Sequence, residues 1–450
     1  MPNDRYRVDH LFLLIGTNPL PNYVAAKLLL RDPQSSQIVL VASVGTEGTR
    51  AALERTLKEE GYRYISSVQV EEANPADIRN KITEQARGLN GLVGLNYTGG
   101  TKAMSVHAYL ALTALTNLHV QYSYLDARTL SLHIEGHGIE TGVTLAAGPH
   151  VTPTVEQVLK LHSRETSLHS DLFWPIIAQA LAEVHSDGQR ADSWQAWIAE
   201  TFFQDPNWPQ PSNENEPLTG DEWRTWVRET FVHHEYKRRT WKKKSAVAQT
   251  PFNLPEALGD VREAFVRELC EPFPTTIREL MAAGRFDKVE ELGKWLEGGW
   301  LETYVMQQVQ AIQEQGIHRL NNVARNIHAT VELANNEGAT SKTEQAPLKQ
   351  EVEIDVAFTR GYQLFVLSCS ASKDRGLCKS KLLEAAIRAE QIGGAEARVA
   401  LVCCNEQPRE LEKEVLDVLG KRVRVFGRAH LAELKQHLAD WITDVSPNQE

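Results

Sequence analysis

Leu95-Asn-Tyr-Thr-Gly-Gly-Thr-Lys-Ala-Met104 is the stretch that decides the fold of the first part of this chain. Before it, the apolar residues Leu92, Val93 and Leu95 predict a buried strand, and the pattern from Ala103 onward predicts a helix. The paired glycines therefore lie in a strand-to-helix turn, where free backbone N–H groups and the positive end of the helix dipole favour an anion. The glycine and lysine spacing of a P-loop is missing, which argues against an ordinary NTPase.

Short apolar segments alternate with helical segments around this turn, from about residue 8 to residue 150. Such alternation is typical of a doubly wound α/β sheet, and in such sheets ligands bind beyond the carboxyl ends of the strands. We therefore expect three loops, 16–22, 44–49 and 98–102, to share one rim, although tight turns of a Rossmann-like scaffold would give the same pattern. The candidate ligand-binding residues are Gly16, Thr17, Asn18, Thr46, Thr98, Gly99, Gly100, Thr101, Lys102 and Met104.

Composition limits the class of protein. The 450 residues are 42% hydrophobic and contain no apolar stretch long enough to span a bilayer, so we expect two or three domains and no membrane partner. The N-terminus lacks a signal-peptide pattern, and the five cysteines lack disulfide or zinc spacing, which together predict a cytoplasmic location. The net charge of -11 means that any nucleic acid must be held by local basic patches.

Near the C-terminus, the run Glu351-Val-Glu-Ile-Asp-Val-Ala-Phe358 alternates polar and apolar residues. This period predicts a strand with its three carboxylates on one face and Val352, Ile354, Val356 and Phe358 in the core. Three carboxylates on one face repel one another unless the face is solvated or a divalent cation such as Mg²⁺ or Mn²⁺ neutralises it. A turn at Arg360-Gly361, a second strand over 364–373, a helix over 379–391 and a strand over 399–403 predict a further α/β unit.

Both ends of the chain resemble the CARF-domain nucleases of type III CRISPR systems, in which a sensor of cyclic oligoadenylate is joined to a PD-(D/E)xK-type nuclease. On the sensor side the resemblance rests on Gly16-Thr-Asn18 and on Thr98-Gly-Gly-Thr-Lys102. On the nuclease side it rests on Gly298-Gly-Trp-Leu-Glu-Thr-Tyr304 and on Glu353-Ile-Asp355, which looks like the acidic metal motif. The implied organisation is a Rossmann-like CARF domain over 1–152, a tryptophan-rich helical connector over 153–275, and a restriction-endonuclease-like α/β domain over 276–450.

The chain departs from this family at the second strand of the hairpin. That strand usually ends in an acidic residue, a spacer and a lysine, but this sequence has Ser368-Cys369-Ser370 there. The acidic residue shares a metal with the aspartate, and the lysine orients the attacking water and offsets phosphate charge, so serine replaces neither well. Glu302 and Glu353 could supply the acid, and Lys373, Lys379 or Lys381 could supply the lysine. The candidate catalytic set is Asp355, Glu353, Glu302, Ser368, Ser370 and Lys373, with Asp355, Glu353 and Glu302 holding the metal.

The resemblance implies a homodimer that binds a cyclic oligoadenylate, with cyclic tetra-adenylate as the first candidate, and then cleaves DNA or RNA in antiviral defence. A two-fold symmetric dimer suits a symmetric ring, and ligand binding would shift the population of the nuclease pair. Two alternatives stay open. In one the protein is a sensor that binds the messenger and regulates a partner without cutting. In the other the sensor is itself a ring nuclease that degrades its ligand near Thr101 and Lys102.

Overall fold

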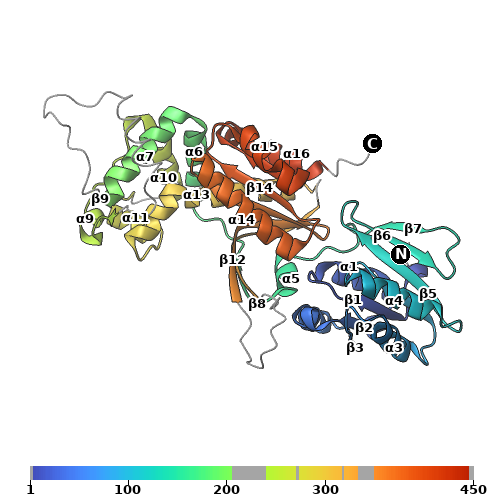
Figure 1. Cartoon of the computed structure of the whole chain (residues 1–450). Coiled ribbons are helices and arrows are strands. Elements are labelled where there is room, and N and C mark those ends of the chain that lie inside the picture. The colour runs from blue at the N-terminus through green and yellow to red at the C-terminus, as the bar shows by residue number, and fades with distance from the viewer. Residues whose placement is uncertain (1–3, 205–239, 270–272, 317–318, 333–348, 445–450) are drawn as a thin grey trace.

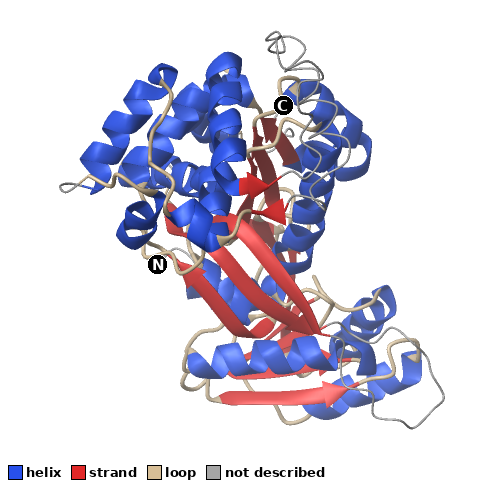
Figure 2. Cartoon of the chain, turned by 90° about the vertical axis from the view of Figure 1, so that its left-hand side faces the viewer, coloured by secondary structure: helices blue, strands red, loops and turns tan. Residues whose placement is uncertain are grey.

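The computed structural model describes residues 4–204, 240–269, 273–316, 319–332 and 349–444. Figure 1 shows an N-terminal sheet lobe in blue to cyan, a C-terminal sheet lobe in orange to red, and a lobe of green and yellow helices beyond the C-terminal sheet. Figure 2, turned by 90°, shows strands of the C-terminal lobe running between layers of helices. No helix of the described ranges combines the length and the apolar character that crossing a membrane would need.

The N-terminal lobe confirms the doubly wound α/β prediction. Its seven-stranded sheet has the order β3-β2-β1-β4-β5-β6-β7, in which the first five strands run parallel and the last two pairings are antiparallel. Leu11 and Leu13 of β1 enter the core on one face, and Phe12 and Leu14 enter the core on the other. The strands are β1 (His10–Leu14), β2 (Gln37–Ala42), β3 (Tyr64–Gln69), β4 (Leu92–Asn96), β5 (His119–Asp126), β6 (Ser131–Gly136) and β7 (Val143–Ala146).

Helices cover both faces of this sheet because its central strands are apolar on both sides. Residues of α1 (Leu20–Leu29) and α2 (Glu47–Glu59) belong to one core, and residues of α3 (Pro75–Ala86) and α4 (Lys102–Thr113) belong to the other. The cap of α3 is Asn74, whose side-chain oxygen accepts hydrogen bonds from the first-turn amides. The four helices thus fix the loops that follow β1, β2 and β4 on one rim of the sheet.

The C-terminal lobe contains the predicted carboxylate hairpin within a six-stranded sheet of order β15-β14-β13-β12-β11-β8. The hairpin strands β12 and β13 pair antiparallel, and β13, β14 and β15 run parallel. Helices α14 (Arg375–Gly393) and α15 (Pro408–Leu419) cover one face, whereas α13 (Trp300–Glu314) and α16 (Leu434–Thr443) cover the other. The strands are β8 (Ser163–His169), β11 (Leu320–Glu332), β12 (Lys349–Arg360), β13 (Gln363–Ser370), β14 (Arg398–Cys403) and β15 (Val423–Phe426).

The segment 153–275 is mainly helical, as the sequence predicted, but it also supplies strands. Its strand β8 pairs with β11 at the edge of the C-terminal sheet, and its helices α6, α7 and α10 share one apolar core with α13 and α16. The sequence of β8, Ser-Arg-Glu-Thr-Ser-Leu-His, is too polar to signal a strand, because an edge strand need bury little. The helices of this lobe are α6 (Pro175–Ser186), α7 (Gly188–Phe202), α9 (Lys244–Ala248), α10 (Gly259–Leu269), α11 (Ile277–Ala283) and α12 (Val289–Lys294).

The two sheet lobes are joined by a continuous apolar core rather than by a loose linker. One cluster of buried side chains runs from α1 and α2 of the N-terminal lobe into α14 of the C-terminal lobe. Helix α5 (Val155–Lys160) lies at this joint, in contact with α2, α14, β8, β11 and β12. Its last carbonyl, at Lys160, accepts a hydrogen bond from Arg55 over 3.0 Å. The lobes therefore pack as one body.

Two glycines mark where the lobes meet most closely. A β-carbon on Gly394, just after α14, would lie 2.4 Å from the side-chain nitrogen of Asn18. A β-carbon on Gly361, at the tip of the β12–β13 hairpin, would lie 2.7 Å from the backbone of Gly148. Both glycines have a positive φ, +77° and +58°, which L side chains rarely adopt. The 16–18 loop of the sensor sheet therefore touches the end of α14 directly.

The stability of the fold is expected to fall as the pH drops from about 6.5 toward 4. His185 is 1% exposed against Trp300, and burial lowers its pKa to about 4. The unfolded chain takes up this proton near pH 6.5 and the folded chain does not, so acid favours unfolding by about 2 kcal/mol at pH 5. His185→Phe should reduce the difference between urea unfolding free energies measured at pH 7 and pH 5 by about 2 kcal/mol, and the part due to His162, whose pKa burial also lowers to about 4, should remain. The exposed-site variant His150→Gln should leave that difference unchanged; a similar change in both variants would contradict the assignment.

Candidate functional site

The paired glycines after β4 close tightly on the end of β1. A β-carbon on Gly99 would lie 2.3 Å from the carbonyl oxygen of Leu14 and 3.0 Å from the amide nitrogen of Gly16. A β-carbon on Gly16 would lie 3.2 Å from the nitrogen of Gly100, whose φ is +74°. The first and third loops of the predicted rim are thus in contact, and only glycine fits at this crossing.

The hydroxyls of the glycine turn support its shape. The Thr98 oxygen accepts a hydrogen bond from the Leu125 amide over 2.8 Å. The Thr101 oxygen caps α4 by accepting from the Met104 amide over 3.2 Å, and the same hydroxyl donates to the Glu72 carbonyl over 3.3 Å. The neighbouring Lys102 is exposed at the first position of α4. The turn therefore presents the start of a capped helix with a cation beside it.

Two predicted ligand-binding residues lie elsewhere. Met104 is 1% exposed, and its thioether packs beneath Gly100 in the core, so its side chain supports the turn from below. The Thr46 hydroxyl accepts from the Ser43 amide over 3.0 Å and is used within its own turn. Sequence spacing could not tell a ligand contact from a supporting residue here, because spacing does not show which way a side chain in a loop or first helical turn points.

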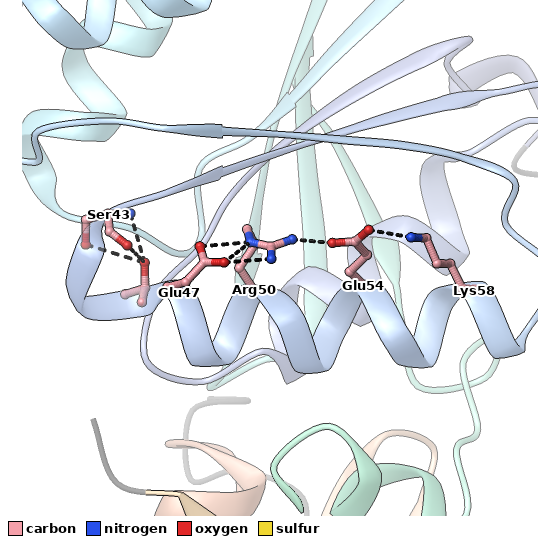
Figure 3. Close-up of polar contacts among 6 residues, drawn as sticks. Ser43, Glu47, Arg50, Glu54 and Lys58 are labelled. Carbon is pink, nitrogen blue, oxygen red and sulfur yellow. Dashed lines mark hydrogen bonds and ion pairs between the residues drawn. The ribbon is translucent and has the colours of Figure 1, made fainter. Parts of the chain in front are cut away.

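Figure 3 shows the turn at Ser43 and the row of charges that follows it along α2. Arg50 lies between Glu47 and Glu54 and forms ion pairs with both, and Glu54 also pairs with Lys58. These charges satisfy one another one turn apart, as is common on an exposed helix face. The acidic Glu47 also suits the positive end of the helix dipole. The loop after β2 also contacts the loop after β1, because the Thr49 hydroxyl donates a hydrogen bond to the Thr17 carbonyl over 3.4 Å.

Asn22 is a supporting residue that the sequence analysis missed. Its side-chain nitrogen donates to the Leu14 carbonyl over 2.9 Å, and its side chain is fully buried. Its amide oxygen has no hydrogen-bond partner, and a β-carbon on Gly99 would lie 3.2 Å from it. The signal was present in the sequence as one polar residue in the otherwise apolar first turns of α1. Asn22 thus holds β1 at the point where the glycine turn crosses it.

The carboxylate hairpin places Asp355 against the end of β13. One Asp355 oxygen accepts from the Cys369 amide over 2.6 Å and from the Ser368 hydroxyl over 3.2 Å. Ser368 and Ser370 are both nearly buried, at 9% and 7% exposure, and the Ser370 hydroxyl accepts from the Ser372 amide over 3.4 Å. The predicted partners of Asp355 on β13 are therefore neutral hydroxyls engaged in the local structure.

The alternation of β12 slips by one residue at Asp355. The sequence predicted one core for its four apolar residues, but they divide between the two cores, Val352 and Ile354 in one and Val356 and Phe358 in the other. Opposite Asp355 on β11 lies Asn326, whose φ is +48°. Such an irregularity re-aims a side chain, as β-bulges do beside functional sites. Glu351 and Glu353 are exposed, whereas Asp355 is half-buried.

Glu302 of α13 faces this acidic strand. Burial, together with the negative charge of Asp355, raises the pKa of Glu302 to about 8, although Arg325 and Lys381 oppose the shift. Glu353 adds to the rise as the smallest of these effects. A nearby cation lowers the pKa of such a carboxyl group and favours its charged form. Glu302 and Asp355 therefore interact electrostatically, and Glu353 acts on Glu302 more weakly.

The three candidate lysines have different surroundings. Lys373, the one named first from the sequence, is exposed and forms an ion pair with Asp192 at 3.1 Å. Lys379 pairs with Glu414 at 3.2 Å. Lys381 donates to the Cys369 carbonyl over 3.1 Å, so it lies at the end of β13 beside Asp355.

Within the described part of the chain, no three His, Cys, Asp or Glu side chains converge closely enough to hold a metal ion. The donors themselves suit a hard divalent cation, because Asp355, Glu302 and Glu353 offer carboxylate oxygens. The raised pKa of Glu302 reflects its burial and the negative charge of Asp355. The residue types and the electrostatics fit such an ion.

Two domain families match the sequence. The family described as the Card1 CARF domain matches residues 11–145, and the family described as the Card1-like endonuclease domain matches residues 289–445. The first match includes the glycine turn, and the second includes Glu302, the carboxylate hairpin and α14. No curated protein matches the chain.

Two solved structures are similar over nearly the whole chain. One is protein VC1899 from Vibrio cholerae, with 16% identity, a TM-score of 0.63, and coverage of 98% of this chain and 99% of that one. The other is Can2 from Sulfobacillus thermosulfidooxidans in complex with cyclic tetra-adenylate, with 16% identity, a TM-score of 0.59, and coverage of 98% of both chains. At this identity the likeness shows a shared fold.

Gly99→Ala is expected to destabilise the protein by about 2 to 3 kcal/mol, because the added carbon would overlap the Leu14 carbonyl and force the crossing apart. Gly48→Ala is the matched control, since a β-carbon there meets nothing within 4 Å and helix α2 should gain up to about 1 kcal/mol. Urea unfolding of both variants measures the difference. Equal stabilities would show that the crossing is looser than described.

Proposed function

Because this chain belongs to the family that joins a Card1 CARF domain to a Card1-like endonuclease domain, we propose that it is a metal-dependent nuclease activated by a cyclic oligoadenylate. The observation that carries the proposal is the pair of distinct sites on one continuous core. A glycine turn at the start of a helix suits a phosphate-bearing ligand. The neighbouring loop of residues 16–18 contacts the end of α14 in the nuclease lobe. A carboxylate cluster on the other lobe suits a divalent cation.

The activator we propose is cyclic tetra-adenylate. Can2, which shares the fold of this chain, was solved in complex with that ligand. The residues proposed to contact it are the exposed Thr17 and Lys102, together with backbone amides at Gly16 and Gly100. Thr98 and Thr101 hold the turn in shape, as their hydrogen bonds indicate. Lys102 supplies the positive charge that a phosphodiester ring requires.

The proposed assembly is a homodimer formed through α4. This helix leaves apolar residues exposed on its outer side, Val106 at 54% and Leu110 at 45%, and Tyr124 of β5 is exposed at 39%. Exposed apolar side chains that gather beside a polar site are typical of an interface. A two-fold axis here would place two glycine turns on one ring-shaped ligand, which suits a symmetric messenger.

The proposed reaction is hydrolysis of a phosphodiester in DNA or RNA. Asp355, Glu302 and Glu353 would hold Mg²⁺ or Mn²⁺, which when bound lowers the pKa of water and offsets charge on the phosphate. The protein itself fixes Asp355 through the Cys369 amide and presents Glu302 from α13. An attacking water oxygen would form a bond to phosphorus while the bond to the leaving oxygen breaks. The water proton would pass to solvent, and the leaving oxygen would be protonated from solvent.

A second function has one observation in its favour. Ser368 and Ser370 bear no charge, and the Ser368 hydroxyl is bound to Asp355 as a structural partner would be. A chain that binds the messenger and regulates a partner without cutting would need nothing more of this hairpin. The assay below separates the two functions.

Purified protein should cut nucleic acid only when cyclic tetra-adenylate and Mn²⁺ are both present, and Asp355→Asn should abolish cutting while ligand binding stays within about twofold. Plasmid and single-stranded DNA and RNA serve as substrates, and calorimetry measures ligand binding. Glu351→Gln is the matched control, because Glu351 lies on the same strand but is exposed. Cutting that survives Asp355→Asn would refute the site, and tight binding without any cutting would support the non-cutting sensor.

Leu110→Asp should convert the dimer to a monomer, because a charge in an apolar contact is poorly solvated, and it should also weaken ligand binding. Light scattering on the eluting peak measures the mass. Val418→Asp is the matched control, since Val418 is 76% exposed on α15, far along the chain from α4. A parent protein that is monomeric with the ligand bound, or a Leu110→Asp variant that stays dimeric, would refute this interface.

A further inference from the structure

The nuclease site contains more negative charge than its own hairpin can balance. Asp355 and Glu353 both act electrostatically on Glu302, and the hairpin residues Ser368 and Ser370 are neutral. A phosphodiester brings a further negative charge, which grows on its oxygens as a nucleophile attacks. A cationic side chain is therefore required near the end of β13, and it must come from another element.

Lys381 lies at this place. Its ammonium nitrogen donates to the Cys369 carbonyl over 3.1 Å, and the amide of the same Cys369 donates to Asp355 over 2.6 Å. The Lys381 ammonium group and the Asp355 carboxylate thus both contact the backbone of Cys369.

The other cations near the cluster are already engaged. Lys373 pairs with Asp192 of the helical lobe, and Lys379, two residues before Lys381 on α14, pairs with Glu414 of α15. Arg325 of β11 donates to the Asp171 carbonyl over 2.8 Å. Lys381 differs from the two other lysines because, among the described residues, its ammonium group contacts a carbonyl at the edge of the acidic cluster and forms no ion pair with a carboxylate.

We infer that Lys381, carried by α14, takes the place of the missing hairpin lysine at the Glu302–Asp355 site, an inference that rests on the proposed nuclease function. Its ammonium group contacts a non-bridging oxygen of the scissile phosphate and orients the attacking water. An ammonium on a flexible four-carbon stem can reach that oxygen from a helix as well as from a strand. Its role is charge compensation, and no proton need leave it.

The test removes the positive charge of Lys381 but keeps an unbranched side chain at that position. In the full chain with cyclic tetra-adenylate and Mn²⁺, Lys381→Met should reduce the cleavage rate about 100-fold, as loss of one charge-stabilising donor does. Lys381→Arg should restore part of that loss. Lys379→Met is the matched control, and it should stay within about threefold of the parent because its ammonium pairs with Glu414. Lys373→Met tests the competing lysine next to the hairpin. Urea unfolding checks that all four variants are folded.

A second measurement does not depend on cutting. Removing the Lys381 charge should tighten Mn²⁺ binding about fivefold, because the ammonium repels a cation at the neighbouring carboxylates, whereas Lys379→Met should leave the affinity unchanged. Unchanged cleavage and unchanged Mn²⁺ affinity in Lys381→Met would overturn the inference, as would a larger loss in Lys373→Met. A parent that binds the activator and Mn²⁺ but never cuts would overturn the proposed nuclease function alone, since the manganese affinities would still decide the position of Lys381.

Discussion

The apolar core shared by the two sheet lobes is the constraint on which the rest of this structure depends. Side chains of α1 and α2 pack in the same cluster as those of α14, and α5 lies at the joint between them. Burying apolar area across a joint resists relative motion more firmly than a polar contact or a linker would. A movement of the loops that follow β1 and β4 would therefore be passed to the nuclease lobe through packed side chains.

The helical lobe lies between the two sheet lobes in sequence, but its helices pack against the nuclease lobe. Its helices share a core only with the nuclease side, through α13 and α16, while the sensor side is reached through α5. Trp194 and Trp300 are fully buried in that core. The buried tryptophans that the structure describes in this lobe are thus packing residues, and the lobe supports α13, which presents Glu302.

Periodicity predicted most of the fold because its strands obey simple rules. The turn at Gly99 and Gly100 follows an apolar strand, polar and apolar residues alternate over 351–358 of the hairpin, and Asn74 caps its helix as expected. Strand β8 escaped prediction because it is polar, and β6 and β7 lie at an edge where the pattern is weak. Long-range pairing of β8 with β11 cannot be read from local sequence at all.

The candidate sites were predicted less completely, because their details depend on where side chains point. Met104 fits the pattern of a ligand contact but lies in the core beneath Gly100. Lys373 is the lysine nearest to the hairpin in sequence, yet it pairs with Asp192, and the lysine beside the carboxylates comes from the middle of α14. The residue types were visible in the sequence, and only the fold could choose among them.

Gly394 gives the molecule a mechanical property. Helix α14 is a stiff rod, and the 13 residues from Lys381 to Gly394 span about 20 Å. Its far end abuts Asn18 with no room for even one methyl group between them. A displacement of Asn18 toward Gly394 would therefore shift or tilt α14 together with the Lys381 ammonium.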